Sequence, residues 1–246
     1  MQCHRQDRDP DFGGSRTTLG IMDEAARKTR LFKGAVFDLD GLLIDSEPVW
    51  MWAQAKAFGE LGVELTPAMQ LATTGMRMRE TLVIWRGYFP SIEIDPEGMR
   101  RRLLELVAGS LRESGMPKPG ALQAMETCRK AGCRMAIASS SMPEIITAAV
   151  DRLGARDMFH ALVSAEGVAH GKPHPAVYLA AAEQLGVGPG ECIAFEDSVF
   201  GLRSAKAAGM HCIAVPEEHN RGRAEYAIAD RILESLEEFG EEFLRR

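Results

Sequence analysis

Three features are scarce or missing in this sequence of 246 residues: long apolar runs, an excess of positive charge, and an ordered set of cysteines. No apolar run reaches the roughly 18 residues that a membrane span requires, so we expect no membrane partner. The formal net charge of -6 at pH 7 leaves no cationic excess for a nucleic-acid backbone or an anionic membrane. These absences favour a small molecule as the partner, and we expect a monomer.

The five cysteines are odd in number and scattered, which predicts the reduced thiols of a cytoplasmic protein rather than disulfides. Residues 1–33 lack the apolar segment of a secretory signal and carry five acidic residues, unlike an organelle transit peptide. We interpret them as a disordered N-terminal extension, in which Met1 and Met22 are both candidate translation starts. No GxGxxG motif follows the first apolar run, which disfavours a dinucleotide-binding enzyme.

After this extension, short apolar runs alternate with segments of helical spacing. The candidate strands are residues 34–39, 134–139, 161–165, 192–196, 211–216 and 229–233. The segments between most of them place Ala, Leu, Ile and Val at helical intervals. This alternation predicts an α/β fold with a doubly wound, Rossmann-like parallel sheet covered by helices on both faces.

Residues 48–117 break that rhythm. Helical patterns occupy about 49–61, 67–72, 78–86 and 96–113, and no convincing strand lies among them. We therefore expect a small four-helix cap domain inserted after the first strand, with a catalytic core formed by residues 34–47 and 118–246. Ligands of open parallel sheets bind beyond the carboxyl ends of the strands, so the residues at those ends matter most.

Polar side chains gather at the predicted strand ends. They are Asp38, Asp40, Ser139, Glu196 and Asp197, with Lys172 in the loop HGKPHP. An isolated DxDG would be a surface turn, Ser141 would cap the helix that begins near Pro143, and an acidic pair at a helix start would also be a cap. The repetition of polar chemistry at several strand ends favours a shared site instead.

Several carboxylates at one sheet edge repel each other unless a cation lies among them. Oxygen ligands without clustered cysteine or histidine favour Mg²⁺. A divalent cation, a lysine and a hydroxyl around a carboxylate complement a phosphoryl group and its transition state. The pattern therefore predicts Mg²⁺-dependent phosphoryl chemistry.

The segments DLDG, ASS, GKPHP and EDS, in this order, resemble the four signature motifs of the haloacid dehalogenase-like superfamily of phosphohydrolases, over about residues 34–233. The resemblance implies that Asp38 is a nucleophile that forms an aspartyl-phosphate. It implies that Asp40 is the general acid and then the general base. A haloacid dehalogenase has no need of the second aspartate, so Asp40 favours phosphate chemistry.

The same resemblance assigns the remaining polar strand-end residues. The implied phosphate-binding residues are Ser139, Ser140 and Lys172. The implied Mg²⁺ ligands are Asp38, Asp197 and the main-chain carbonyl of Asp40, with Glu196 either touching the ion or one layer outside it. A non-enzymatic phospho-receiver module would also place an aspartate beside Mg²⁺, but the helical insertion and the position of Lys172 weigh against it.

The helical insertion resembles the cap of the branch that contains β-phosphoglucomutase, phosphoglycolate phosphatase and bacterial sugar phosphatases. Within that branch, DGLLIDSEPVW, TGMR and EDSVFGLRSAKAAGM are similar to the hexitol and 2-deoxyglucose 6-phosphate phosphatases. This implies hydrolysis of a small phosphorylated sugar or polyol, with a phosphosugar mutase or a phosphoglycolate phosphatase as alternatives. The β-phosphoglucomutases have a histidine where this chain has Trp50, which argues against mutase activity.

Four residues are candidates for contact with the rest of the substrate: Asp45, Glu47, Gly75 and Arg77. Arg77 could grip hydroxyls or a second phosphate, or lie on a solvated helix face. Asp45 and Glu47 could meet the same pocket or cap a hinge. We interpret Trp50 and Trp85 as part of the cap core rather than as platforms for a sugar ring.

Overall fold

The computed structural model describes Met1 and residues 31–246. Our interpretations of residues 2–30, including the second start at Met22 and the thiol of Cys3, lie outside this described part. The described core begins slightly before the predicted boundary at Gly34. Phe32 is buried, and its backbone N–H donates to the carbonyl of Leu244 at 3.0 Å.

Six parallel strands form one sheet in the order β3-β2-β1-β4-β5-β6, which confirms the predicted α/β class. The strands are β1 (Gly34–Phe37), β2 (Arg134–Ser139), β3 (Ala161–Ser164), β4 (Cys192–Glu196), β5 (His211–Ala214) and β6 (Arg231–Ile232). β1 and β4 are adjacent and buried along their whole length. A continuous apolar run suits such a strand because helices cover both of its faces. The carboxyl ends of β1, β2 and β4 consequently meet at one edge.

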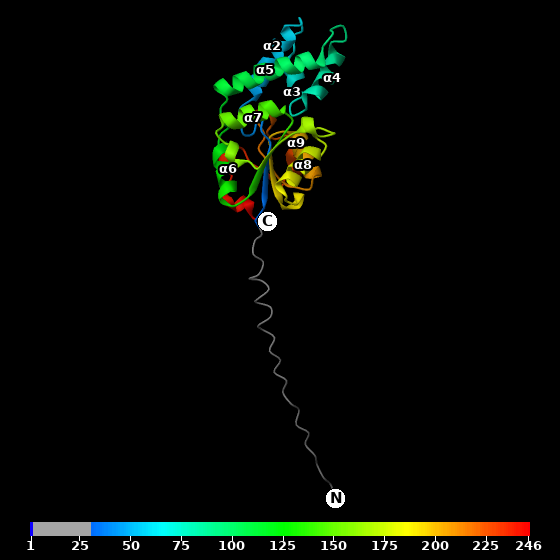
Figure 1. Ribbon diagram of the computed structural model, residues 1–246. Helices are drawn as coiled ribbons and strands as arrows, with labels where there is room; N and C mark the ends of the chain where they lie inside the picture. Colours follow the sequence, from blue (N-terminus) through cyan, green and yellow to red (C-terminus); the bar gives the residue numbers. More distant parts are fainter. Residues whose placement is uncertain (2–30) are drawn as a thin grey trace.

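Helices cover the two faces of the sheet separately (Figure 1). The core helices are α6 (Ala121–Lys130), α7 (Pro143–Arg152), α8 (Ala176–Leu185) and α9 (Val199–Ala207). Alternate residues of a strand point to opposite faces. Phe37 accordingly packs in the cluster that contains α6 and α7, whereas Val36 packs in the cluster that contains α8 and α9.

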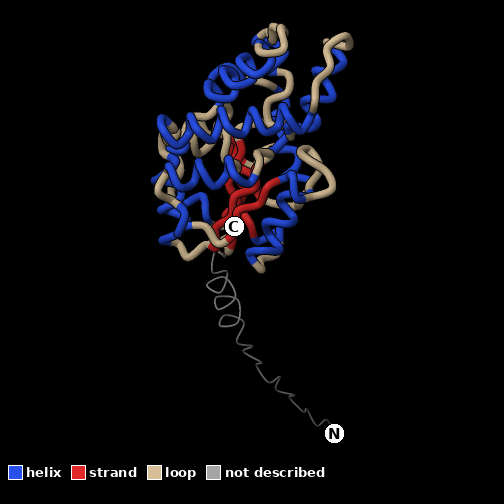
Figure 2. Tube along the Cα trace, turned by 45° about the horizontal axis from the view of Figure 1, so that its top comes forward, coloured by secondary structure: helices blue, strands red, loops and turns tan. Residues whose placement is uncertain are grey.

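Four helices lie between β1 and α6, as the sequence pattern predicted. They are α2 (Glu47–Gly59), α3 (Pro67–Leu71), α4 (Met78–Tyr88) and α5 (Pro96–Ser114). Thr66 and Asp95 cap α3 and α5 through their side chains, each followed by a proline at the start of the helix. Figure 2 shows these helices grouped beyond one end of the sheet. We call them the cap helices.

The cap helices have an apolar interior of their own. Trp85 of α4 is fully buried and meets Phe58 of α2 edge to face, with ring centroids 5.0 Å apart. This confirms the interpretation of Trp85 as cap core. α5 lies against both α2 and the core helix α7, so it joins the cap to the sheet layer below.

No helix in the described part of the chain is both long and apolar enough to cross a membrane. The cysteines at 128, 133, 192 and 212 are free and buried. For the described residues this agrees with the expectation of unpaired thiols.

Candidate active site

The carboxyl ends of β1 and β4 bring a lysine between two acidic side chains. Lys172 Nζ lies 2.5 Å from Asp38 Oδ1 and 2.5 Å from Glu196 Oε1. All three side chains are buried. β1 and β4 pair in register, with Phe37 opposite Phe195, so the residue after each strand's core reaches the same edge. The structure thus brings together residues that are 134 and 24 positions apart in the chain.

Protein donors occupy both oxygens of Glu196. Tyr178 donates its hydroxyl to Oε1 at 2.5 Å, beside Lys172. The backbone N–H and the hydroxyl of Ser198 both donate to Oε2. Through these hydrogen bonds Glu196 holds Lys172 and the loop at Ser198 in place.

Asp38 and Asp197 keep carboxylate oxygens without a hydrogen-bond partner among the described residues, and both side chains line a cavity. Together with Glu196 they offer oxygens within 4.8 Å of one another. Burial, reinforced by Glu196 and Asp40, raises the pKa of Asp38 to about 8 although Lys172 opposes the shift. Burial and the nearby Asp38 raise the pKa of Asp197 well above its usual value.

The site therefore carries more buried negative charge than Lys172 neutralises. Burial alone would lower the pKa of Lys172, but Asp38 and Glu196 hold it above the ordinary value, so the lysine stays charged. A further cation would balance these carboxylates, and their oxygen atoms are suitable ligands for a hard divalent ion such as Mg²⁺. Gly41 keeps the loop close to these donors: its φ is +79°, and a Cβ there would lie 2.5 Å from Asp197 Oδ2.

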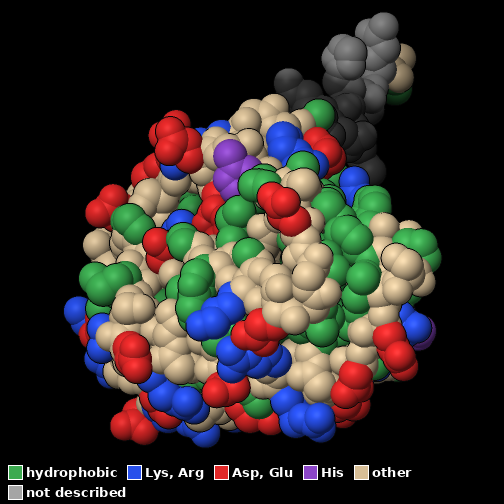
Figure 3. Space-filling model, turned by 90° about the horizontal axis from the view of Figure 1, so that it is seen from above, with side chains coloured by type: hydrophobic (Ala, Val, Ile, Leu, Met, Phe, Trp, Pro, Cys, Tyr) green, Lys and Arg blue, Asp and Glu red, His purple; other side chains and the backbone are tan. Residues whose placement is uncertain are grey.

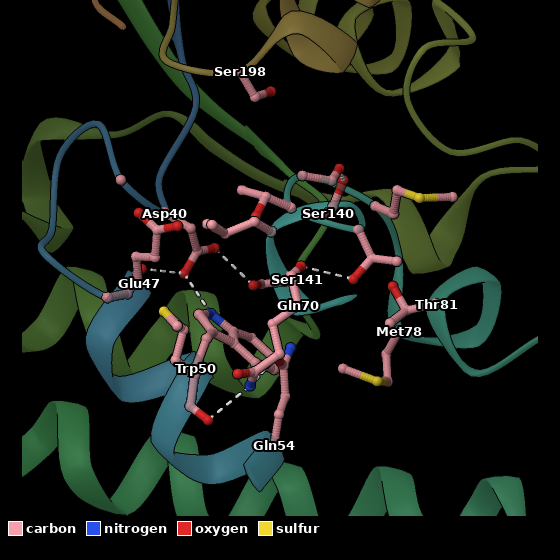
Figure 4. A pocket seen from close by; sticks show the side chains of 18 of the residues that line it. Asp40, Glu47, Trp50, Gln54, Gln70, Met78, Thr81, Ser140, Ser141 and Ser198 are labelled. Carbon is pink, nitrogen blue, oxygen red and sulfur yellow. Dashed lines mark hydrogen bonds between the residues drawn. The ribbon is translucent and has the colours of Figure 1, made fainter. Parts of the chain in front are cut away.

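Asp40 accepts hydrogen bonds from four side chains. Ser46 and Trp50 donate to Oδ1 at 2.7 and 2.9 Å. Ser139 and Ser141 donate to Oδ2 at 3.3 and 2.7 Å. Figure 4 shows Trp50 and Ser141 reaching Asp40 from different sides. These four donors hold the Asp40 carboxylate in place just beyond the carboxyl end of β1, where Asp40 lines the same cavity as Asp38.

Two of these donors correct our sequence interpretations. Ser141 does not cap α7, which has no side-chain cap; its hydroxyl binds Asp40 instead. Trp50 packs partly against the cap interior, but its indole N–H points to Asp40. No local signal in the sequence identified Ser46, Ser141 or Tyr178 as parts of the site, because each acts through a residue that is distant in the chain or on another element.

The predicted phosphate-binding serines lie at the end of β2: Ser139 is its last residue and Ser140 follows it. Ser139 is buried, and its hydroxyl also accepts the backbone N–H of Ser141 at 2.9 Å. Ser140 lines the cavity and donates to the carbonyl of Gly75 at 2.7 Å. The loop after β2 therefore touches both Asp40 and the cap.

A cavity of about 900 Å³, counted with its open mouth, lies between the strand ends and the helices α2, α3 and α4. The core contributes Asp38, Asp40, Gly41, Ser140, Ser141, Met142, Asp197 and Ser198. Figure 4 shows Ser198 and Asp40 on one side and Gln54, Met78 and Thr81 of the cap on the other.

Only part of the predicted substrate-contact set reaches this cavity. Glu47 and Gly75 line it, whereas Asp45 and Arg77 do not. Asp45 is exposed, and its backbone N–H donates to Met116 at 2.9 Å, which joins the two segments that enter and leave the cap. The hinge alternative describes Asp45 better than the pocket alternative.

Arg77 is buried, but it faces the core loop after β3. Its Nη1 donates to the carbonyls of Ala165 and Val168, each at 3.1 Å. Its Nε and Nη2 donate to Glu80 in the first turn of α4, the helix that Arg77 precedes. A Cβ at Gly171 would lie 2.4 Å from Arg77 Nε, so glycine there leaves room for the guanidinium. Arg77 fastens the cap to the core.

Glu47 forms a second acidic group with Glu217 at the edge of the cavity, and His219 lies near it. Burial and the neighbouring Glu217 raise the pKa of Glu47 to about 8. Burial alone would raise the pKa of Glu217, but hydrogen bonds with Glu47 and Lys118 lower it. Glu47 is therefore the carboxyl group of this pair that binds a proton more readily, and Lys118 Nζ lies 3.0 Å from Glu217 Oε1.

Comparisons with known proteins agree with this geometry. Hexitol phosphatase B of Escherichia coli (strain K12) is 35% identical over 210 residues, which are 85% of this chain and 95% of that protein. Fructose-1-phosphate phosphatase YqaB of the same strain is 31% identical over 187 residues, covering 75% and 96%. A crystal structure of a CbbY mutant from Rhodobacter sphaeroides, in complex with xylulose-(1,5)bisphosphate, has a TM-score of 0.77 at 27% identity and covers 88% of this chain and 100% of that chain.

The family model of haloacid dehalogenase-like hydrolases matches residues 32–209. This range contains the first strand with Asp38 and Asp40, the cap helices, and the strand that ends at Glu196. The match thus includes every element that supplies a side chain to the cluster around Lys172. By this match and by its relatives, the chain belongs to the haloacid dehalogenase-like hydrolase family.

Proposed function

We propose that this chain, a phosphoric monoester hydrolase, releases phosphate from a small phosphorylated sugar or polyol in a Mg²⁺-dependent reaction through an aspartyl-phosphate. One observation carries the proposal. Asp38 has one carboxylate oxygen held by Lys172 and the other open to the cavity, next to the fixed carboxyl of Asp40. A nucleophile beside an acid–base group is what two-step ester hydrolysis requires.

In the first step, the free oxygen of Asp38 bonds to phosphorus and the ester P–O bond breaks. Asp40, as the general acid, gives a proton to the departing alkoxide. In the second step, Asp40 takes a proton from water, which attacks the phosphorus and releases inorganic phosphate from Asp38. Lys172 and the loop with Ser139 and Ser140 bind the phosphoryl oxygens and stabilise their developing charge.

Mg²⁺ fits the excess of buried carboxylate charge at this site. Asp38, Asp197 and the main-chain carbonyl of Asp40 would hold it, with Glu196 outside the ligand set. When bound, the ion would neutralise charge on the phosphoryl group. We infer from the same arrangement that Lys172 keeps its proton throughout the reaction.

The relatives support a sugar or polyol phosphate as the substrate. Two of them are named for a hexitol and for fructose 1-phosphate. Trp50 weakens the mutase alternative: an indole N–H donates to Asp40 but neither accepts nor delivers a proton in ester chemistry. A mutase needs such a group to return the phosphate to its second hydroxyl.

We also propose the division into a core, residues 34–47 and 118–246, and a cap that opens and closes, residues 48–117. A bridge between Ile44 and Pro117, where the chain enters and leaves the cap, supports a hinge there. We propose a cytoplasmic monomer, and the free, buried cysteines of the described part are consistent with a reducing compartment.

Phosphate release from a panel of hexose, hexitol, pentose, nucleotide and two-carbon phosphates, with Mg²⁺ and with a chelator, tests the proposal. We expect turnover on sugar or polyol phosphates that chelation abolishes and added Mg²⁺ restores. Conversion of glucose 1-phosphate into glucose 6-phosphate without phosphate release would support the mutase alternative. Release that is insensitive to chelation would contradict the metal assignment.

A further inference from the structure

Beyond Glu47, the first residue of α2, the cavity wall formed by the cap helices is uncharged. Its residues are Trp50, Met51, Gln54, Gln70, Leu71, Thr73, Thr74, Gly75, Met76, Met78 and Thr81. The charged side chains among the described lining residues are Asp38, Asp40, Glu47 and Asp197, all acidic, and no Lys, Arg or His of the described chain belongs to the lining. A substrate therefore meets charge at its phosphate end and uncharged amide, hydroxyl, thioether, indole and aliphatic groups at its other end.

Two glutamines order the polar part of this wall. Gln70 is buried, and its amide nitrogen donates both to the carbonyl of Met51 at 2.8 Å and to Gln54 Oε1 at 3.0 Å. A backbone carbonyl can only accept, so the bond to Met51 establishes which end of the Gln70 amide is nitrogen. It follows that Gln54 accepts through its oxygen and keeps its NH₂ group free of partners in the described chain. Gln54 is one of the residues that line the cavity.

The basic side chains near the cavity are committed elsewhere. Arg77 is bound by two core carbonyls and Glu80. Lys172 lies beneath Asp38 and serves the transferred phosphate, and Lys118 is paired with Glu217. The described structure thus holds no cation for a second anionic group at the cap end of the cavity.

We propose that the cap wall selects phosphate monoesters whose far end is uncharged and carries hydroxyl groups, and that it rejects esters with a second phosphate or a carboxylate there. The Gln54 NH₂ group donates to a substrate hydroxyl, and Gln70 holds that amide in place. A second phosphate or a carboxylate on the substrate would be desolvated in this cavity, close to the acidic Asp40 and Glu47 and to neutral groups. No positive charge in the described lining would compensate for that cost. This inference rests on the proposed phosphatase function and deepens it.

Three substrates that differ only at the far end test the selection: sorbitol 6-phosphate, sorbitol 1,6-bisphosphate and 6-phosphogluconate. We expect kcat/KM for the neutral ester to exceed the other two by about 100-fold or more, as for sites that leave a substrate group unpaired. Similar values for all three would overturn the inference and leave the phosphatase function standing. No release from any of the three, nor from the wider panel, would overturn the proposed function itself.

A charge series at Gln54 then tests whether the wall is responsible. Gln54→Lys should raise kcat/KM for 6-phosphogluconate relative to sorbitol 6-phosphate by about tenfold, and Gln54→Glu should lower that ratio. Gln54 is partly exposed on α2, so either side chain can be accommodated. The matched control, Gln123→Lys on the exposed side of α6, should leave the ratio unchanged. A ratio that is the same in all three Gln54 forms, with unfolding midpoints close to wild type, would contradict the assignment.

Discussion

The two walls of the cavity are built from different chemistry. The sheet wall contains the acidic residues Asp38, Asp40 and Asp197. Lys172 lies outside the lining, is buried, and pairs with both Asp38 and Glu196. The cap wall holds neutral amides, hydroxyls and methionines on the helices α2, α3 and α4 and on the loop between α3 and α4. Under the proposals above, the two walls have separate tasks: the charged site performs the chemistry, and the neutral wall selects the substrate.

The regions that support the two walls also differ, in how deeply their apolar side chains are buried. The strands β1 and β4 are buried throughout, whereas the cap helices leave large apolar side chains in solvent, among them Val83 at 70% and Tyr88 at 58% exposure. Figure 3 views the cap end and shows apolar, acidic and basic side chains interspersed on that face. Substitutions in the sheet wall should therefore remove activity, and substitutions in the cap should redistribute it.

The largest effect is expected at Asp38. Asp38→Asn keeps the volume and removes the nucleophile, so kcat should fall by about 10⁴-fold or more. Because it also removes one of the crowded buried carboxylates, the variant should unfold at the same temperature as wild type or higher. Steady-state phosphate release and a thermal melt measure both quantities. Activity within tenfold of wild type would show that another group is the nucleophile.

A smaller loss of turnover is expected from the cap residue that reaches the sheet wall. Trp50→Phe removes one of four donors to Asp40, and a hydrogen bond to a charged acceptor contributes about 1.5–3 kcal/mol. We expect kcat to fall about tenfold or somewhat more, with a shifted pH profile of kcat and little change in KM. Trp52→Phe, on the exposed side of the same helix, is the control. Equal effects of the two substitutions would contradict the role of Trp50.

Arg77 distinguishes a cap-to-core contact from a substrate contact. Arg77→Met leaves the carbonyls of Ala165 and Val168 without their donor, which should lower the free energy of unfolding by about 1–3 kcal/mol and reduce kcat/KM only a few-fold. Arg79→Met, whose partner carbonyl lies 3.4 Å away at the exposed surface, should change neither. A large rise in KM with unchanged stability would restore Arg77 as a substrate ligand.

The smallest effect is a pH dependence at the edge of the cap. The pKa of Glu47 is raised to about 8 in the folded chain, from an ordinary value of 4.5. Between these values the folded state holds a proton that the unfolded state has lost, so stability falls as the pH rises from 4.5 to 8. Glu47→Gln should flatten this decline relative to wild type, whereas Glu64→Gln at an exposed position should not.

Denaturant titrations at pH 5, 7 and 9 measure the decline. Asp38 and Asp197 also have raised pKa values and contribute in the same direction in every variant, so the difference between variants reports on the pair of Glu47 and Glu217. An unchanged slope in Glu47→Gln would mean that Glu47 is ionised in the folded chain.

Much of the architecture could be predicted because buried strands and helix faces show up in the sequence as apolar runs and as periodic apolar residues. The apolar run at 34–37 and the alternation of strands and helices indicated the parallel sheet, and four helical patterns indicated the cap helices. Asp38, Asp40 and Asp197 could be predicted as site residues because strand ends of a parallel sheet share one edge. Their carboxylates all line the cavity.

What only the tertiary structure decided is which side chains meet across elements. The position of α2 places the indole N–H of Trp50 at Asp40. Arg77 binds carbonyls of the loop after β3 instead of lining the cavity, and Glu217 lies next to Glu47. Periodicity encodes which face of a helix is buried, but not the rotation and position at which that helix docks on another element. The sequence by itself therefore determined the fold and the charged wall at the strand ends. Which cap residues form the neutral wall of the cavity depends on how the cap helices dock on the sheet.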